Sequence, residues 1–262
     1  MTLASISLSV PDAIDSTHSP AVVMQKVAGS DTGPAVLIAT MHGKEAILGP
    51  ILAGLGFQVL LPIGYDTDAL GTFSGDVRRP GTAFEAALEK ARRACDATGL
   101  SRAVSSEGTY RPSQTLFPGA RNAELLAFVD RETGFECVEY VTDTPTRFDK
   151  GRVPPDVHAP EVQALLKTIG WPQIRVLVVP HDPGVGVVMP EWVFKGIGNE
   201  RDLAEAFEVC AGYSTDGWVH LETDLRAHMN PSRMASIATV GERLALRLAA
   251  QGYRSEPVQS SQ

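Results

Sequence analysis

The sequence contains few cysteines and no pattern that would use them together. Its three cysteines, Cys95, Cys137 and Cys210, are odd in number and widely spaced, which argues against a disulfide framework and a paired-cysteine zinc site. The sequence also lacks an apolar run long enough to cross a bilayer. Its first residues lack the basic and apolar regions of a signal peptide. We therefore expect a cytoplasmic protein of bacterial type.

Basic residues are outnumbered by acidic ones. The chain has 23 Lys and Arg against 31 Asp and Glu, which gives a net charge of −8. This balance argues against general binding to nucleic acid or to an anionic membrane, although it leaves room for a local basic pocket. The chain has 262 residues, of which 44% are hydrophobic. That is enough for one large core or two small ones.

Strands and helices are predicted to alternate along the chain. Continuous apolar runs bounded by turn residues predict strands over 21–27, 34–40, 57–62, 103–107 and 174–179, and a hairpin over 124–141. Apolar stripes predict helices over 45–55, 82–98, 161–170, 202–211 and 233–250. Loops are predicted over 65–80, 110–120 and 147–160. The pattern favours an α/β fold with a mixed sheet flanked by helices.

We divide the chain into three parts on the same pattern. Residues 1–33 form an N-terminal extension, residues 34–250 a single α/β domain, and residues 251–262 a disordered tail. Two lobes with a central cleft are compatible with the middle part, and the sequence leaves this point open.

The segment Thr40-Met41-His42-Gly43-Lys44 joins a predicted strand to a predicted helix. Backbone N–H groups at a helix N-terminus favour anions, and a lysine there adds a full charge. The carboxyl ends of strands are also where open α/β sheets bind ligands. The segment therefore predicts a phosphate site; the alternative is a plain helix start with a solvated Lys44.

Two carboxylates are candidates for the acidic part of a site. Glu85 lies in the first turn of a predicted helix, where an acid also suits the helix dipole. Glu107 ends a predicted buried strand and precedes Gly108. Carboxylates from separate elements suit Mg²⁺, which prefers hard oxygen ligands, and either could instead act as a general base on water. We predict that both lie in one cleft with Lys44.

Polar residues occupy every second position late in the chain, at His220, Glu222, Asp224, Arg226 and His228. An extended segment would place all of these on one face, and a solvent-facing edge strand is the alternative. Immediately downstream, Asn230 and Pro231 predict a helix start. Arg233 in the first turn of that helix, together with the nearby Arg226, offers a second anion site.

Several segments resemble an uncharacterised bacterial family known only as a domain of unknown function. The similarity extends from about Pro34 to Leu248, over IATMHGKE, DTDALGTFSGDVRRPGTAFEAALEKA, SSEGTY, FKGI and ETDLRAHMNPSRM. Members of that family often end in a zinc-ribbon-like tail with paired cysteines. This chain ends in QGYRSEPVQSSQ, which has no cysteine, so no metal or partner site is expected in its tail.

A remoter resemblance is to inosine triphosphate pyrophosphatases and Maf-like nucleotide phosphatases. The segments that carry it are Thr40 to Lys44, GTAFEAALEKARRACDATGL, Ser106-Glu107-Gly108 and Pro231-Ser232-Arg233. It implies a fold like that of inosine triphosphate pyrophosphatase, commonly dimeric. It also implies that Thr40 and Lys44 hold phosphate and that Glu85 is a metal ligand.

These observations predict a hydrolase that depends on Mg²⁺ or Mn²⁺ and acts on a nucleoside triphosphate or a related phosphoanhydride. The predicted phosphate-binding residues are Thr40, His42, Lys44, Arg226, His228, Asn230 and Arg233. The predicted metal ligands are Glu85, Glu107 and Asp224, with Glu107 and Glu85 also as catalytic residues.

Two alternatives remain open. One is a non-catalytic module that binds a nucleotide or another phospho-metabolite. The other is a specialised-pathway enzyme that acts on a phosphorylated small molecule by phosphoryl or sugar-phosphate transfer. In each case the expected partner is a small molecule, with no nucleic acid and no membrane. The resemblance to the pyrophosphatases also implies a homodimer.

Overall fold

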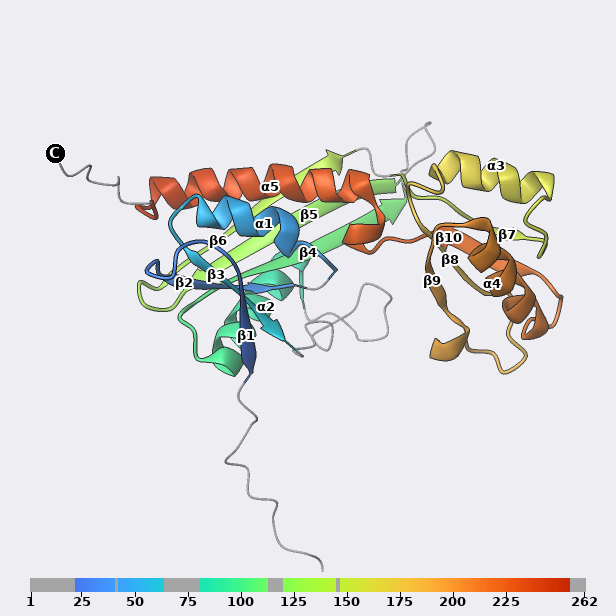
Figure 1. Ribbon diagram of the computed structural model, residues 1–262, viewed down its shortest axis with the longest axis horizontal. Helices are drawn as coiled ribbons and strands as arrows, with labels where there is room; N and C mark the ends of the chain where they lie inside the picture. Colours follow the sequence, from blue (N-terminus) through green and yellow to red (C-terminus); the bar gives the residue numbers. More distant parts are fainter. Residues whose placement is uncertain (1–21, 41, 64–80, 113–119, 145–146, 255–262) are drawn as a thin grey trace, which may run out of the picture.

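The computed structural model describes residues 22–40, 42–63, 81–112, 120–144 and 147–254. The elements in these ranges form two β-sheets, each with its own helices (Figure 1). None of the helices in these ranges combines the length and the apolarity that crossing a membrane requires.

The larger sheet has six strands among the described residues, in the order β1-β3-β2-β4-β5-β6. They are β1 (Val23–Ala28), β2 (Ala35–Ala39), β3 (Gln58–Ile63), β4 (Arg102–Pro112), β5 (Ala120–Asp130) and β6 (Phe135–Thr144). Strand β2 is parallel to β3 and β4, whereas β1 is antiparallel to β3, and β4, β5 and β6 pair antiparallel. The mixed α/β architecture expected from the sequence is confirmed, and β1 extends the sheet with a strand from the predicted N-terminal extension.

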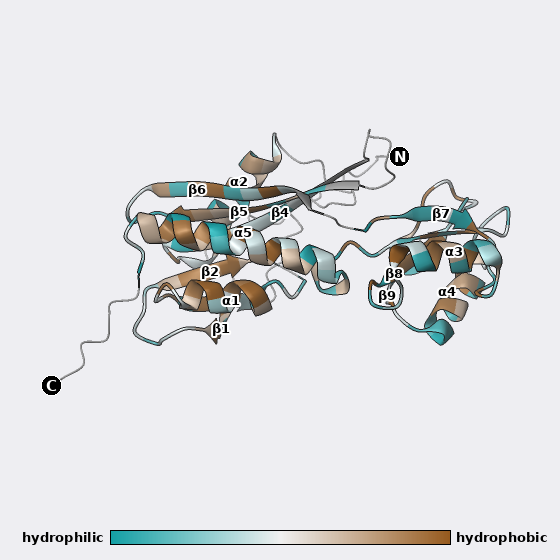
Figure 2. Cartoon of the chain, turned by 90° about the horizontal axis from the view of Figure 1, so that it is seen from above, coloured by the Kyte–Doolittle hydropathy of each residue, from teal (hydrophilic) through white to brown (hydrophobic). Residues whose placement is uncertain are grey.

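Helices cover both faces of the larger sheet. Strand β2 alternates, so that Val36 and Ile38 join a buried cluster with α1 (Glu45–Ala53) and α5 (Pro231–Ala250), whereas Leu37 and Ala39 join a second cluster with α2 (Ala83–Thr98). Burial on both faces of the sheet explains why β2 is apolar throughout. Most of α1 is apolar as well (Figure 2). The carboxyl end of β2 therefore lies between α1 and α5 on one side and α2 on the other.

The smaller sheet has the order β7-β10-β8-β9, and all its pairings are antiparallel. Its strands are β7 (Lys150–Val153), β8 (Val176–Pro180), β9 (Phe194–Ile197) and β10 (Val219–Thr223). Helices α3 (Pro160–Ile169) and α4 (Glu200–Gly212) share one buried cluster with this sheet. After β10 the chain passes through the 3₁₀-helix η3 (Ala227–Met229) into α5, which lies along the larger sheet (Figure 1).

Several sequence-based boundaries are wrong. The predicted loop at 147–160 contains β7, and the predicted loop at 110–120 is shortened because β4 continues to Pro112 and β5 begins at Ala120. Strand β9 was not predicted. The segment 220–228 is not one extended strand, because β10 ends at Thr223 and a turn and η3 follow.

Candidate functional site

The turn between β2 and α1 has an unusual backbone and is fixed against η3. His42 and Gly43 both have positive φ angles, of 72° and 74°, a region that costs energy for a residue with a side chain. The backbone oxygen of His42 accepts a hydrogen bond from the His228 amide at 3.2 Å. The two imidazole rings stack, with centroids 5.7 Å apart. A Cβ atom on Gly43 would lie 3.1 Å from the Cβ of His228, so glycine permits this close approach.

Lys44 follows this turn at the N-cap position of α1, and its side chain is directed into the protein. The residue is 6% exposed. Its Nζ donates a hydrogen bond to the Oγ of Ser106 on β4 at 2.5 Å. The Oγ1 of Thr40 lies 3.2 Å from the same Ser106 oxygen. The predicted phosphate segment and the Ser-Glu-Gly segment therefore meet inside the protein, and the solvated Lys44 considered from the sequence is wrong.

The environment of Lys44 disfavours its charged form. Burial is the main reason why the pKa of its amine falls to about 7, and the positive charges of Arg233 and Lys90 lower it further, whereas Glu124 and Glu107 act in the opposite direction. The positive end of the α1 dipole also opposes a cation at this position. Near neutral pH the amine is therefore divided between its free and protonated forms, and a bound anion would favour the protonated one.

A buried ion pair lies beside Lys44. The Nε of Arg233, in the first turn of α5, lies 2.5 Å from the Oε1 of Glu124 on β5. Its NH1 group donates to the backbone oxygen of Leu225. Gly108 lies directly beneath this pair, because a Cβ atom there would be 2.5 Å from NH2 of Arg233. The glycine that follows Glu107 in the sequence is thus explained by the approach of Arg233.

Glu107 is buried, but its position in β4 directs it to the opposite face of the sheet from Ser106. The neighbouring Ser105 donates to the backbone oxygen of Ala87 in α2, and side chains two residues apart on a strand share a face. Glu107 therefore faces the α2 side of the sheet. Lys90, which is 7% exposed and one turn after Ala87 in α2, belongs to the same side. Glu107 still lies close enough to Lys44 to raise its pKa.

Glu85 is not part of this buried cluster. It is exposed at the first turn of α2, where its Oε2 accepts a hydrogen bond from the Thr82 amide at 2.7 Å, and its own amide donates to Thr82 Oγ1 at 3.2 Å. This reciprocal capping box satisfies two free amides of the helix N-terminus. The carboxylate is used for helix capping, whereas the sequence-based alternative was an acid that suits the helix dipole.

Asp224 and Arg226 bind each other. The guanidinium NH2 of Arg226 lies 2.7 Å from Oδ2 of Asp224, and the same carboxylate accepts from the backbone amide of Gly196 in β9 at 2.9 Å. Asp224 is 1% exposed. These bonds turn the chain immediately after β10, which explains why the alternating polar pattern does not continue as a strand.

The three carboxylates predicted to bind Mg²⁺ do not form a joint site. Glu85 caps α2, Glu107 lies on the α2 side of the sheet and Asp224 binds Arg226. In the described ranges no group of three or more His, Cys, Asp or Glu side chains could hold a metal ion. The structure therefore does not bring these three carboxylates together around one ion.

Asn230 caps the last helix. Its Oδ1 accepts hydrogen bonds from the Arg233 amide at 3.2 Å and from the Ser232 hydroxyl at 2.6 Å, and Pro231 begins α5. The predicted helix start is therefore confirmed. The cap also fixes the direction in which Arg233 leaves the helix toward Glu124.

Three residues of the cluster were not singled out from the sequence: Ser106, Glu124 and Lys90. Glu124 is a carboxylate that directly precedes the apolar segment Leu125–Val129, and Lys90 lies beside the apolar stripe of α2. An ionisable residue on a buried face is a signal for a buried pair. Ser106 could have been separated from Glu107 by the alternation of a strand.

The model of the family described as "Domain of unknown function (DUF6671)" matches residues 90–256 of the chain. The chain belongs to this family. The matched range includes Lys90, Ser106, Glu124 and Arg233, whereas the β2–α1 turn precedes it. No curated protein and no solved structure matches the chain.

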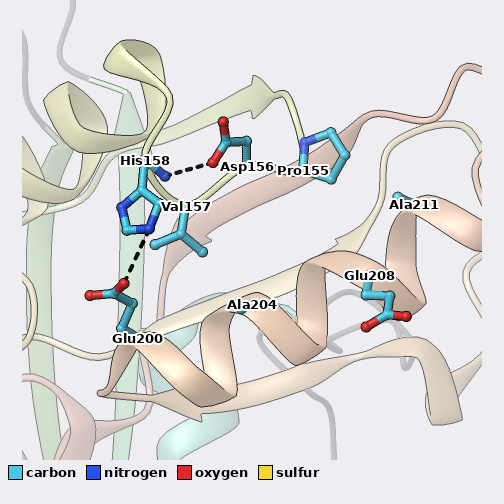
Figure 3. Close-up of a pocket in the computed structure, with 8 residues that line it drawn as sticks. All are labelled: Pro155, Asp156, Val157, His158, Glu200, Ala204, Glu208 and Ala211. Carbon is cyan, nitrogen blue, oxygen red and sulfur yellow. Dashed lines mark hydrogen bonds and ion pairs between the residues drawn. The ribbon is translucent and has the colours of Figure 1, made fainter.

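A separate pocket of about 500 Å³ lies in the smaller sheet's group of elements, between the segment before α3 and the helix α4 (Figure 3). The residues that line it are Pro155, Asp156, Val157, His158, Glu200, Ala204, Glu208 and Ala211. The Nε2 of His158 lies 3.4 Å from an oxygen of Glu200. None of the residues predicted from the sequence lines this pocket, and its acidic lining would repel a phosphate.

Proposed function

We propose that this chain binds a phosphorylated small molecule at the β2–α1 turn and hydrolyses it. The substrate class is a nucleoside triphosphate or a related phosphoanhydride. The observation that carries the proposal is the buried amine of Lys44, which is held by Ser106 at the N-terminus of α1 and close to Arg233 and Lys90.

The chemistry of this cluster suits a phosphate. The N-terminus of α1 and the cations Lys44, Arg233 and Lys90 are only partly offset by Glu124 and Glu107, which favours an anion here in a chain whose net charge is −8. An arriving phosphate would be stabilised by these cations, and it would raise the fraction of Lys44 that is protonated. Arg226 and Arg233 are already bound to Asp224 and Glu124. We therefore expect Lys44 to be the main direct ligand of the phosphate and the two arginines to contribute only their charge.

The finer features expected from the sequence belong to the same proposal. They are a fold like that of inosine triphosphate pyrophosphatase and two lobes, formed by the two sheets, with the substrate between them. The dependence on Mg²⁺ or Mn²⁺ stays a prediction. Because the three predicted carboxylates do not gather, such an ion would enter with the phosphates of the substrate, as Mg²⁺ commonly does.

The test is a hydrolysis screen of the full chain against nucleoside triphosphates, with and without Mg²⁺ or Mn²⁺, in which release of phosphate and pyrophosphate is measured. We expect turnover that falls at least about 100-fold in Lys44→Met. The matched control is Lys167→Met, since Lys167 is exposed on α3, and this variant keeps full activity.

The second candidate function is binding without catalysis, and the internal ion pair of Arg233 favours it because that guanidinium is already bound to Glu124. Calorimetric titration with the same nucleotides separates the two. Binding that depends on Lys44 without turnover in either metal would establish the binding module. The absence of both binding and turnover would contradict the phosphate site itself.

A further inference from the structure

The Lys44–Ser106 contact places an amine within hydrogen-bonding distance of a serine hydroxyl. We infer that Ser106 is the nucleophile of the proposed hydrolysis and that Lys44 removes its proton, so that the reaction passes through a phosphate ester on Ser106. This inference rests on the proposed function and names the residue that attacks phosphorus.

Three side chains form a hydrogen-bonded row at this point. Thr40 Oγ1 lies 3.2 Å from Ser106 Oγ, and Ser106 Oγ lies 2.5 Å from Lys44 Nζ. A serine hydroxyl becomes an effective nucleophile when a base lies within hydrogen-bonding distance and a third group orients it. Here Lys44 is within that distance, and Thr40 fixes the serine oxygen from the other side.

Lys44 is able to act as a base through the fraction of its amine that is unprotonated near neutral pH, a fraction that bound phosphate reduces. The charged groups that shift its pKa are Arg233 on α5, Glu124 on β5, Lys90 on α2 and Glu107 on β4. Burial and the two cations outweigh the two carboxylates, so the pKa of Lys44 is lowered to about 7. A general base works best when its pKa is near the working pH.

The step balances without a further reactant. The amine of Lys44 takes the hydroxyl proton as Ser106 Oγ forms a bond to phosphorus, and the bond from phosphorus to the bridging oxygen breaks, with the electron pair leaving on that oxygen. The proton then passes to the leaving phosphate. Water attacks the same phosphorus, and Lys44 transfers a proton of that water to Ser106 Oγ as the ester bond breaks.

The neighbouring residues do not fit this role. Ser105 faces α2, and its hydroxyl donates to the Ala87 backbone oxygen at 2.5 Å. Glu107 shares that face, so neither its position nor that of Glu85 at the exposed start of α2 places a carboxylate beside Ser106 Oγ. The side chains that meet the Ser106 hydroxyl are those of Lys44 and Thr40.

The test uses a small alkyl fluorophosphonate on the full chain, followed by mass spectrometry of the peptide that contains Ser106. Attack by a serine oxygen on this probe forms the oxygen–phosphorus bond and releases fluoride. We expect one adduct at Ser106, formed at a rate that rises with pH through about 7. Lys44→Met lowers this rate at least about 100-fold, and the matched control Ser105→Ala leaves it unchanged.

Two outcomes would overturn the inference. One is the absence of an adduct at Ser106, and the other is an adduct that forms equally fast in Lys44→Met. A second experiment distinguishes failure of this inference from failure of the proposed function. The Ser106→Ala variant is checked for folding by circular dichroism and is then titrated with the nucleotides of the screen. Retained binding without turnover supports Ser106 as the nucleophile, whereas binding with full turnover contradicts that role and leaves the proposed function intact.

Discussion

Arg233 at the start of α5 and Glu124 on β5 form a buried ion pair, with 2.5 Å between Nε and Oε1. Removal of one partner leaves the other charge buried without compensation. We expect Arg233→Met to lower the free energy of unfolding by about 3–5 kcal/mol. Urea denaturation followed by circular dichroism measures this change.

The double variant Arg233→Met with Glu124→Leu is the control for that experiment. It removes both charges, so most of the lost stability should return. If the double variant loses as much free energy of unfolding as the two single variants together, the two charges are not energetically coupled.

Gly108→Ala should also destabilise the protein. Its new Cβ would lie 2.5 Å from NH2 of Arg233, which is held by Glu124 and by Leu225, so the ion pair must shift, at a cost of about 1–3 kcal/mol. Thermal unfolding measures it. Gly212→Ala in α4 is the matched control, because nothing lies within 4 Å of its Cβ position. Equal stability of the two variants would show that the Arg233 side chain can shift away from the new Cβ without a measurable loss of stability.

The stability of the protein should rise with pH above neutrality because of Lys44. Its pKa is about 7 in the folded chain, against an ordinary value of 10.5. Between these values the unfolded chain binds the extra proton, so the free energy of unfolding increases with pH, by up to about 1.4 kcal/mol per pH unit. Below the folded pKa the full cost of burying a charged lysine is present.

Urea titrations between about pH 6.5 and about pH 8.5 measure this slope. In Lys44→Met it should be absent. Burial raises the pKa of the Cys137 and Cys210 thiols, to about 11 and about 12, and these groups oppose the trend only at higher pH, where the unfolded thiols lose protons. A slope that persists unchanged in Lys44→Met would assign it to another group.

Glu85 should affect stability more than chemistry. Glutamine at this position can still accept the hydrogen bond from the Thr82 amide, so Glu85→Gln should keep both stability and turnover. Glu85→Ala loses the cap and should cost about 0.5–2 kcal/mol. Loss of turnover in Glu85→Gln with normal stability would return Glu85 to the catalytic residues.

The sequence was sufficient for the main elements of the fold. The apolar run of β2, the stripe of α2 and the Asn230–Pro231 helix start were all read correctly, because each depends on local chemistry that a short window contains. Strand β7 is short and polar, and its pairing partner β10 lies far along the chain. Strand β9 has only four residues, with Lys195 and Gly196 between its two apolar ones, so local patterns did not reveal either strand.

Some residues of the candidate site were predicted because they lie in short local motifs that the sequence shows. His42 contacts His228. Thr40 and Lys44 meet at Ser106, and Arg233 lies near enough to Lys44 to lower its pKa. The face of the sheet on which each residue lies was not deduced. Ser106 and Glu107 are adjacent in sequence, yet strand alternation separates them, and only the packing of α2 and α5 decides which one meets Lys44.

The return of the chain from β10 to α5 has a consequence for biosynthesis. The larger sheet and α1 are made early, but Arg233 and the rest of α5, which cover one face of that sheet, are made only after the whole smaller sheet. During translation Glu124 therefore leaves the ribosome long before its cation, and the apolar face beneath α5 is exposed to other nascent chains. The candidate site is completed only when the last helix docks.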